Sequence, residues 1–188
     1  MLNYLHKLLL EYSRTRQYIM EVFMQTIEIL DIKLFMQFLF QTTALDTYEF
    51  ISSELRTDMS YTLDGHINRE FFTDDEQDAL GIKDVSYLPW HIAKEKIFTL
   101  IKGKKTPSQL KIVLKADRTQ TNSLLSSISS SFQENDIDGL FLNIIFQENK
   151  LDVICGISYK IFTMDKSLES AFFEETIALL KSYKITCQ

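Results

Sequence analysis

Two parts of the sequence have the same order of secondary-structure patterns, and this order limits the folds open to the chain. In the first part, a predicted strand over residues 26–30 is followed by Asp31, which suits a helix N-cap, and by apolar residues at helical spacing. In the second part, a predicted strand over 110–116 is followed in the same way by Asp117. Two further strands complete each part, over 48–63 with a turn near 56–59, and over 140–146 and 151–157. We therefore predict an α+β fold in which helices cover one face of an antiparallel sheet.

The spacing of two residue types is consistent with an internal duplication of a β-α-β-β unit. Phe50 and Gly65 are 15 positions apart, and so are Phe141 and Gly156. Each glycine is followed by a Phe-Thr pair, seven positions later in the first part and six in the second. A fixed order of elements with matched spacing is typical of a repeated structural unit. The alternative is that chance supplies part of this match.

Three more helices are predicted from capping signals and apolar periodicity. Their ranges are 73–81, 89–102 and 167–184. The first begins at Thr73 and has Glu76 three positions later, which is the pattern of a capping box. The second has Pro89 in its first turn, where proline is well tolerated. Its apolar face includes Trp90, which we expect in the core; the alternative is a hydrophobic anchor for a partner.

Length and charge bound the class of protein. A chain of 188 residues is expected to form one domain. We assign 24–188 to a single α+β domain and 1–23 to an N-terminal helical or mobile extension, because Met24 is a second plausible start. The net charge of −6 excludes a whole-chain basic footprint for nucleic acid, and no apolar run is long enough for a membrane span. Two cysteines without a CxxC motif predict free thiols and a cytoplasmic location.

Positive charge is concentrated in one segment, residues 94–118. This segment has eight Lys and Arg residues against two acidic ones, a local charge of +6 in a chain of −6. Such segregation is typical of a surface that attracts phosphate groups, an acidic partner or a nucleic-acid backbone. The predicted binding residues are Lys102, Lys104, Lys105, Lys111 and Lys115. The alternative is a solvated helix face and loop that bind nothing.

The motifs predict no catalytic residue, metal site or cofactor. The three histidines are not paired at metal-ligand spacing, and neither GxGxxG nor GxSxG occurs. The best polar group is Asp64, His66 and Asn68, which would share one face of a strand and could serve acid–base chemistry. The alternative is a turn with hydrogen-bonded side chains. Cys155 lies in an apolar strand and is expected to be an inert buried thiol.

Three runs of the sequence carry a resemblance to a known family: DGHINREFFTDDEQDALG, YLPWHIAKEKIFTLIKGKKTP and GLFLNIIFQENKLDVICGISYKIFTMDKSL. They resemble a family of small proteins from clostridia and related Firmicutes that is known only as a domain of unknown function. This resemblance extends from about Met24 to the end of the chain and implies no catalytic residue. The repeated order of elements is also similar to one domain of the sliding DNA clamps, which implies a clamp-like fold. The helices that line clamp rings are basic, whereas the two matching helices here have one cation each, Lys33 and Arg118.

These observations predict a non-enzymatic binding or interaction module. Its partner is expected to be a protein or a phosphate-bearing ligand that the lysines attract. One alternative is a nucleic-acid-associated, clamp-like protein. A second alternative is an enzyme with its site at Asp64, His66 and Asn68. The oligomeric state stays open, because an exposed sheet edge permits self-association without requiring it.

Overall fold

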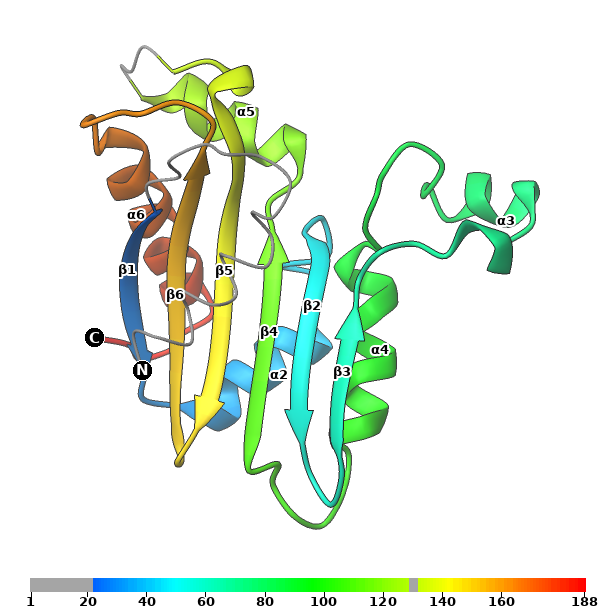
Figure 1. The fold of residues 1–188 in the computed structure, drawn as a ribbon. Helices are drawn as coiled ribbons and strands as arrows, with labels where there is room; N and C mark the ends of the chain where they lie inside the picture. The colour runs from blue at the N-terminus through cyan, green and yellow to red at the C-terminus, as the bar shows by residue number, and fades with distance from the viewer. Residues whose placement is uncertain (1–21, 129–131) are drawn as a thin grey trace.

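A six-stranded antiparallel sheet forms the centre of the molecule (Figure 1). The computed structural model describes residues 22–128 and 132–188. The strands are β1 (Val22–Ile29), β2 (Glu49–Arg56), β3 (Ser60–Asp64), β4 (Gln109–Lys115), β5 (Ile137–Gln147) and β6 (Lys150–Tyr159). Their order across the sheet is β1-β6-β5-β4-β2-β3, and every neighbouring pair is antiparallel. The predicted α+β class with an antiparallel sheet is confirmed.

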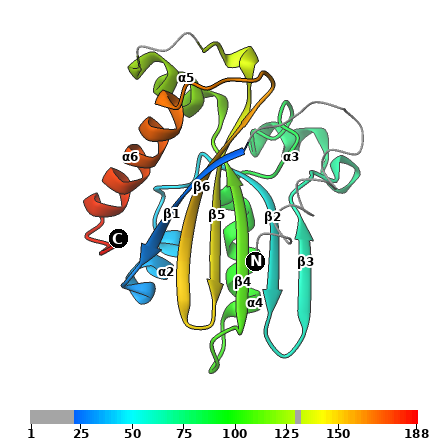
Figure 2. The same ribbon diagram turned by 60° about the vertical axis from the view of Figure 1, so that its left-hand side comes forward.

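The helices that cover the sheet lie on one of its faces, as Figures 1 and 2 show. The helices are α2 (Ile32–Gln41), α3 (Asp74–Ala79), α4 (Trp90–Ile101), α5 (Arg118–Ser127) and α6 (Ser167–Ser182), with single 3-10 turns η1 (Arg69–Phe71) and η2 (Glu134–Asp136). The Asp31 and Asp117 carboxylates accept backbone N–H bonds at 2.9 and 2.7 Å, and Thr73 opens α3 with a capping box. All three predicted caps are confirmed. None of the described helices is long and apolar enough to cross a membrane.

One core fills the space between the sheet and the helices. In β4, the alternate residues Leu110, Ile112 and Leu114 are buried, so the residues between them face the other side of the sheet. Trp90, the first residue of α4, is 0% exposed, and its indole Nε1 donates to the Leu39 carbonyl oxygen at 3.2 Å. Trp90 therefore belongs to the core, as predicted.

The predicted duplication is present in the order of elements but not in the pairing of strands. Both β1-α2-β2-β3 and β4-α5-β5-β6 follow the β-α-β-β order, yet β4 lies beside β5 while β1 and β2 are separated by three strands. The matched spacing reflects hairpin geometry. Gly156 lies directly opposite Phe141, and the Gly65 N–H donates to the Ile51 carbonyl oxygen next to Phe50 at 2.8 Å. Because Phe50 faces the core and Phe141 the opposite side of the sheet, the two units bury different residues.

The C-terminal residues cover part of the edge strand β1. The Glu28 N–H donates to the Gln188 carbonyl oxygen at 2.8 Å, and the Gln188 N–H donates back to Glu28 at 3.0 Å. The Leu30 N–H also donates to the Thr186 carbonyl oxygen at 2.9 Å. Among the described elements, β3 is then the edge strand that has no such cover along its length.

Some element boundaries differ from the predicted ones by a few residues. β1 begins at Val22, two residues before the predicted domain start at Met24. The rest of the predicted extension lies outside the described residues. The acidic helix α3 ends at Ala79, and Gly81 follows with a φ of +65°, a conformation that glycine adopts without strain. Pro89 lies one position before α4 rather than in its first turn.

Residues 66–86 form an arm that joins β3 to α4 and projects from the sheet (Figure 1). Hydrogen bonds from the Arg69 guanidinium connect separate parts of the arm. Its Nη1 donates to Gln77 Oε1 and to the Ile82 carbonyl oxygen, each at 3.3 Å, and its Nη2 donates to the Val85 carbonyl oxygen at 2.7 Å. Hydrogen bonds from a charged donor are stronger than neutral ones, so the arm has a fixed shape of its own.

Candidate binding site

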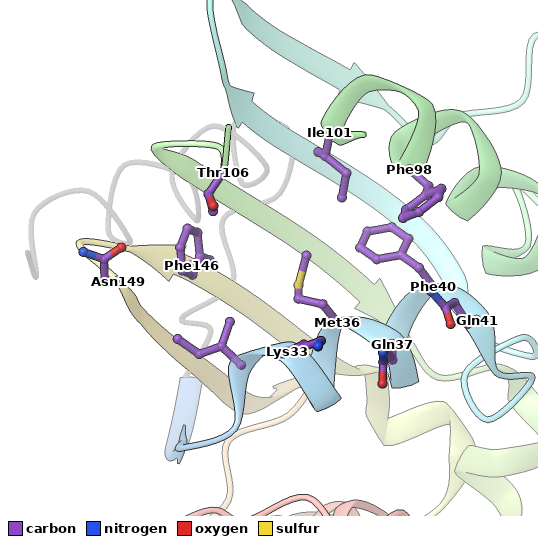
Figure 3. Close-up of a pocket in the computed structure, with 11 residues that line it drawn as sticks. Lys33, Met36, Gln37, Phe40, Gln41, Phe98, Ile101, Thr106, Phe146 and Asn149 are labelled. Atoms are coloured by element: carbon purple, nitrogen blue, oxygen red, sulfur yellow. The ribbon is translucent and has the colours of Figure 1, made fainter. Parts of the chain in front are cut away.

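An apolar groove of about 500 Å³ lies between α2 and α4, beside the turn from β5 to β6 (Figure 3). Its apolar walls are formed by Ile32, Met36, Phe40, Phe98, Ile101 and Phe146. The polar residues along it are Lys33, Gln37, Gln41, Thr106 and Asn149. A concave, mostly apolar surface with a few polar groups is the usual form of a ligand site.

Phe40 and Phe98 form the wall of the groove that continues into the core. Their ring centroids are 5.5 Å apart, and the Phe40 ring also packs against Trp90 at 5.8 Å. Phe40 is 8% exposed, whereas Phe98 is 37% exposed and presents its ring to the groove. Because this wall is backed by the core, the groove has a fixed shape on that side.

A basic loop, residues 102–105, follows α4 and borders the groove. The Lys102 N–H donates to the Phe98 carbonyl oxygen at 2.9 Å and ends the helix. Lys104 and Lys105 then follow in an exposed stretch, and Thr106 lines the groove. In the part of the chain that the structure describes, none of these three lysines forms an ion pair with a carboxylate. Three unpaired ammonium groups beside an apolar surface attract anionic groups, and they also interact favourably with the carbonyl end of α4.

Lys111 and Lys115 lie away from the basic loop. Their side chains are on the face of β4 opposite the buried one, which none of the described helices covers (Figures 1 and 2). Lys111 is directly opposite Glu54 of β2, and Lys115 is directly opposite Glu49. Burial lowers the pKa of Lys111 against the effect of Glu54, and burial raises the pKa of Glu49 against the effect of Lys115. Such cross-strand charge pairs stabilise strand pairing. The other three predicted binding residues, Lys102, Lys104 and Lys105, lie in the basic loop.

Lys94, which also contributes to the basic segment, has a structural role. Its ammonium forms an ion pair with Asp46 and donates to the Thr42 carbonyl oxygen at 2.8 Å. The side chains of Lys94 and Asp46 are 12% and 23% exposed. This contact joins α4 to the segment that follows α2 and removes one cation from the accessible basic surface.

The polar group at residues 64–68 is only partly assembled. His66 Nδ1 lies 2.7 Å from Asp64 Oδ1, and the His66 backbone N–H, which lowers the pKa of Asp64, donates to the same oxygen at 3.0 Å. The two side chains are 59% and 74% exposed, and the His66 ring packs on Tyr87. Asn68 begins η1, and its side chain makes no capping hydrogen bond there. These residues lie at the base of the arm, and within 22–128 and 132–188 no three metal-ligating side chains gather.

Cys155 is a buried thiol in β6. Burial raises its pKa to about 11, although a hydrogen bond with Thr176 acts in the other direction. Because the thiolate is the reactive form, we expect a thiol reagent at pH 8 to modify Cys187 about a hundredfold faster than Cys155 in the folded protein. Mass spectrometry of timed samples measures both rates. Equal rates before unfolding would contradict the burial of Cys155.

Comparison with protein-family models shows a match to a family of unknown function, DUF5721, over residues 37–188. The chain belongs to this family. The predicted membership in a family known only as a domain of unknown function is thus confirmed, over a range that begins after Met24. A search of curated proteins and a search of solved structures gave no match, so the clamp-like architecture of this DUF5721 protein stays a prediction.

The groove was not predicted from the sequence. Phe98 lies about two helical turns after Trp90 in α4, but Trp90 is buried whereas Phe98 is partly exposed. In α2, the apolar positions include Met36 and Phe40 in addition to those that face the sheet. A stripe wider than one packing face could have indicated a second apolar surface.

Proposed function

We propose that this DUF5721 protein is a non-enzymatic binding module, and that its binding site is the groove together with the basic loop. The observation that carries the proposal is the position of the basic loop, whose chain neighbours Ile101 and Thr106 both line the groove. Within the described residues, its three lysines form no ion pair. The partner has an apolar anchor beside carboxylate or phosphate groups. The anchor enters the groove, and the anionic groups face Lys102, Lys104 and Lys105.

Two forces contribute to binding at such a site. Removing apolar surface from water contributes about 25 cal/mol per Å² and provides most of the affinity. The exposed lysines steer an anionic partner toward the site and contribute less to the affinity, since solvent and salt screen them. Binding is therefore expected to weaken at high salt without being lost completely.

The triple variant Lys102→Ala, Lys104→Ala, Lys105→Ala tests the role of the loop. The probe is anilinonaphthalene sulfonate, an aromatic anion that fluoresces when it binds apolar protein surface. If each exposed lysine contributes roughly 0.5 kcal/mol, the triple variant should raise the dissociation constant of the probe about tenfold. The same variant should also remove most of the salt dependence seen with the native chain.

A matched control has the same change in charge at a distant place. Lys160, Lys181 and Lys184 are exposed residues outside the groove, and their replacement by alanine should leave probe binding unchanged. A second variant, Phe98→Ala, should weaken binding of the probe at any salt concentration, because it removes part of the apolar wall. Equal losses in the two triple variants would overturn the proposal, since they would indicate a general effect of net charge.

The nucleic-acid alternative is tested with the same variants. Lys111 and Lys115 oppose carboxylates on the other face of the sheet, so the basic surface at the groove is formed by the loop and Lys33. Titration of duplex DNA at two salt concentrations should show no binding that depends on Lys102, Lys104 and Lys105. If the native chain binds DNA in a salt-dependent manner and the triple variant does not, the partner of the basic loop is nucleic acid rather than an acidic protein or small anion. The cytoplasmic location stays a prediction from the sequence.

A further inference from the structure

We propose that the groove binds the arm of a second copy of this chain, with Phe71 in the groove and the acidic residues of the arm facing the basic loop. This inference rests on the proposed function, because it uses the same groove and the same three lysines. It adds the identity of the partner. The interface it describes is head-to-tail: the arm of one protomer meets the groove of the next.

The arm presents an apolar anchor to solvent. Phe71 is 74% exposed at the end of η1, and its ring packs edge-on against Phe72, with centroids 5.2 Å apart. The Arg69 hydrogen bonds hold the surrounding backbone, so little conformational entropy is lost when Phe71 is buried. Exposed aromatic side chains on pre-organised segments are typical of residues that dominate binding energy in interfaces.

The charge of the arm complements that of the groove. Residues 66–86 contain six carboxylates and two cations, a net charge of −4 with histidine neutral. Asp74 and Asp75 are exposed, and they follow Phe71 closely in the chain. The groove has the opposite charge at its border, with Lys33 along it and the three lysines of the basic loop beside it. An anchor flanked by carboxylates and a groove flanked by ammonium groups attract each other before contact.

The arm cannot reach the groove of its own chain. The arm ends just before α4 and the basic loop begins just after it, so the two lie at opposite ends of this helix (Figure 1). α4 has 12 residues, and at about 1.5 Å per residue its ends are roughly 18 Å apart. The internal hydrogen bonds of the arm keep it from folding back along the helix. A contact between arm and groove is therefore intermolecular. In the head-to-tail arrangement proposed here, each dimer leaves one arm and one groove free.

The first measurement is the solution mass of the full chain as a function of concentration, by sedimentation equilibrium at low and at high salt. The average mass should rise with concentration beyond that of a dimer at low salt, because a head-to-tail contact does not close on itself at two copies. High salt should shift the association to higher concentration. A mass that stays at the monomer value, or that stops at a dimer, overturns the proposal.

Two variants that each remove one half of the contact give the sharper test. The arm variant is Phe71→Ala, and the groove variant is the triple lysine-to-alanine change at 102, 104 and 105. Each alone should weaken self-association at least about tenfold, since one side of every contact is altered. Mixed together, they should form a one-to-one heterodimer with the native dissociation constant, because the groove of the first is intact and so is the arm of the second. No other pairing in the mixture has two intact sides.

The controls separate this proposal from the proposed function. Phe162 is 70% exposed on the loop after β6, and Phe162→Ala should leave self-association unchanged. If mixing does not restore association, the head-to-tail contact is excluded. If the chain stays monomeric but anilinonaphthalene sulfonate still binds in a manner that depends on the three lysines, the second copy is not the partner and the binding site remains. If the mixed variants associate but probe binding does not depend on the three lysines, the lysines bind the arm and not a small aromatic anion. The second copy is then the partner, and the proposed binding of other anionic ligands fails.

Discussion

Replacing Trp90 by alanine is expected to lower the free energy of unfolding by about 3–5 kcal/mol, the usual cost of deleting a large buried aromatic side chain. Trp90 is 0% exposed and packs between Phe40 and Phe50, with ring centroids at 5.8 and 6.1 Å. Its indole N–H also donates to the Leu39 carbonyl oxygen, one of the last carbonyls of α2, which has no partner within the helix. The substitution therefore creates a cavity and leaves a buried acceptor without a donor.

Urea unfolding followed by far-UV circular dichroism measures this loss, since the variant has no tryptophan for fluorescence. Trp90→Phe fills much of the space but cannot donate a hydrogen bond, so it should cost about 1–3 kcal/mol, the penalty for a buried unsatisfied group. Phe162→Ala, at an exposed site, should change stability by less than about 0.5 kcal/mol. A loss below about 1 kcal/mol for Trp90→Ala would contradict the core position of this residue.

Gly65→Ala is the second substitution with a large expected effect. A Cβ at this position would lie 1.8 Å from the Phe50 carbonyl oxygen and 2.8 Å from that of Ile51. Both are backbone atoms of β2, so the clash cannot be relieved by rotating a side chain. The strands must separate where the Gly65 N–H donates to Ile51. We expect a loss of about 3 kcal/mol or more, at the upper end of what overpacking costs.

Gly103 provides the matched control for this substitution. Among the described residues, nothing lies within 4 Å of a Cβ built there, and no left-handed conformation is required. Gly103→Ala should therefore leave stability unchanged or raise it by about 0.4–1 kcal/mol, because alanine has fewer conformations to lose on folding. Similar losses at both positions would contradict the close approach of β2 at Gly65. Hydrogen exchange of the backbone amide at position 65 would show whether its hydrogen bond to Ile51 is weakened in the Gly65→Ala variant.

The helix caps and the hairpins were predictable because the residues that indicate them are close together in the sequence. Asp31 and Asp117 were recognised as caps from the residues that follow them, and each forms the expected hydrogen bond. The hairpins follow from alternation and turn residues within about 20 positions. The order of the strands was not predictable, because β1 pairs with β6 more than 100 residues later. No periodicity in one sequence encodes a partner at that distance.

In the candidate site, too, features set by neighbouring residues were predictable and features set by distant residues were not. Lys102, Lys104 and Lys105 were identified from charge density alone, and they lie together because they are neighbours in the chain. The alternation of β4 was visible in the sequence, but the face that the helices cover was not, so Lys111 was grouped with the loop. The groove combines residues of α2, α4 and β5, and it exists only once these elements meet in space.

The hydrogen bonds between Glu28 and Gln188 make the two sides of the sheet unequal. Beside β1, backbone groups at Glu28 and Leu30 are already occupied by the chain's own last residues. An added strand from another polypeptide would find these donors taken, whereas no described segment covers β3 along its length. Growth of the sheet by strand addition is therefore blocked at the end of β1 beside the C-terminal residues, and among the described residues the flank that carries the arm has no such block.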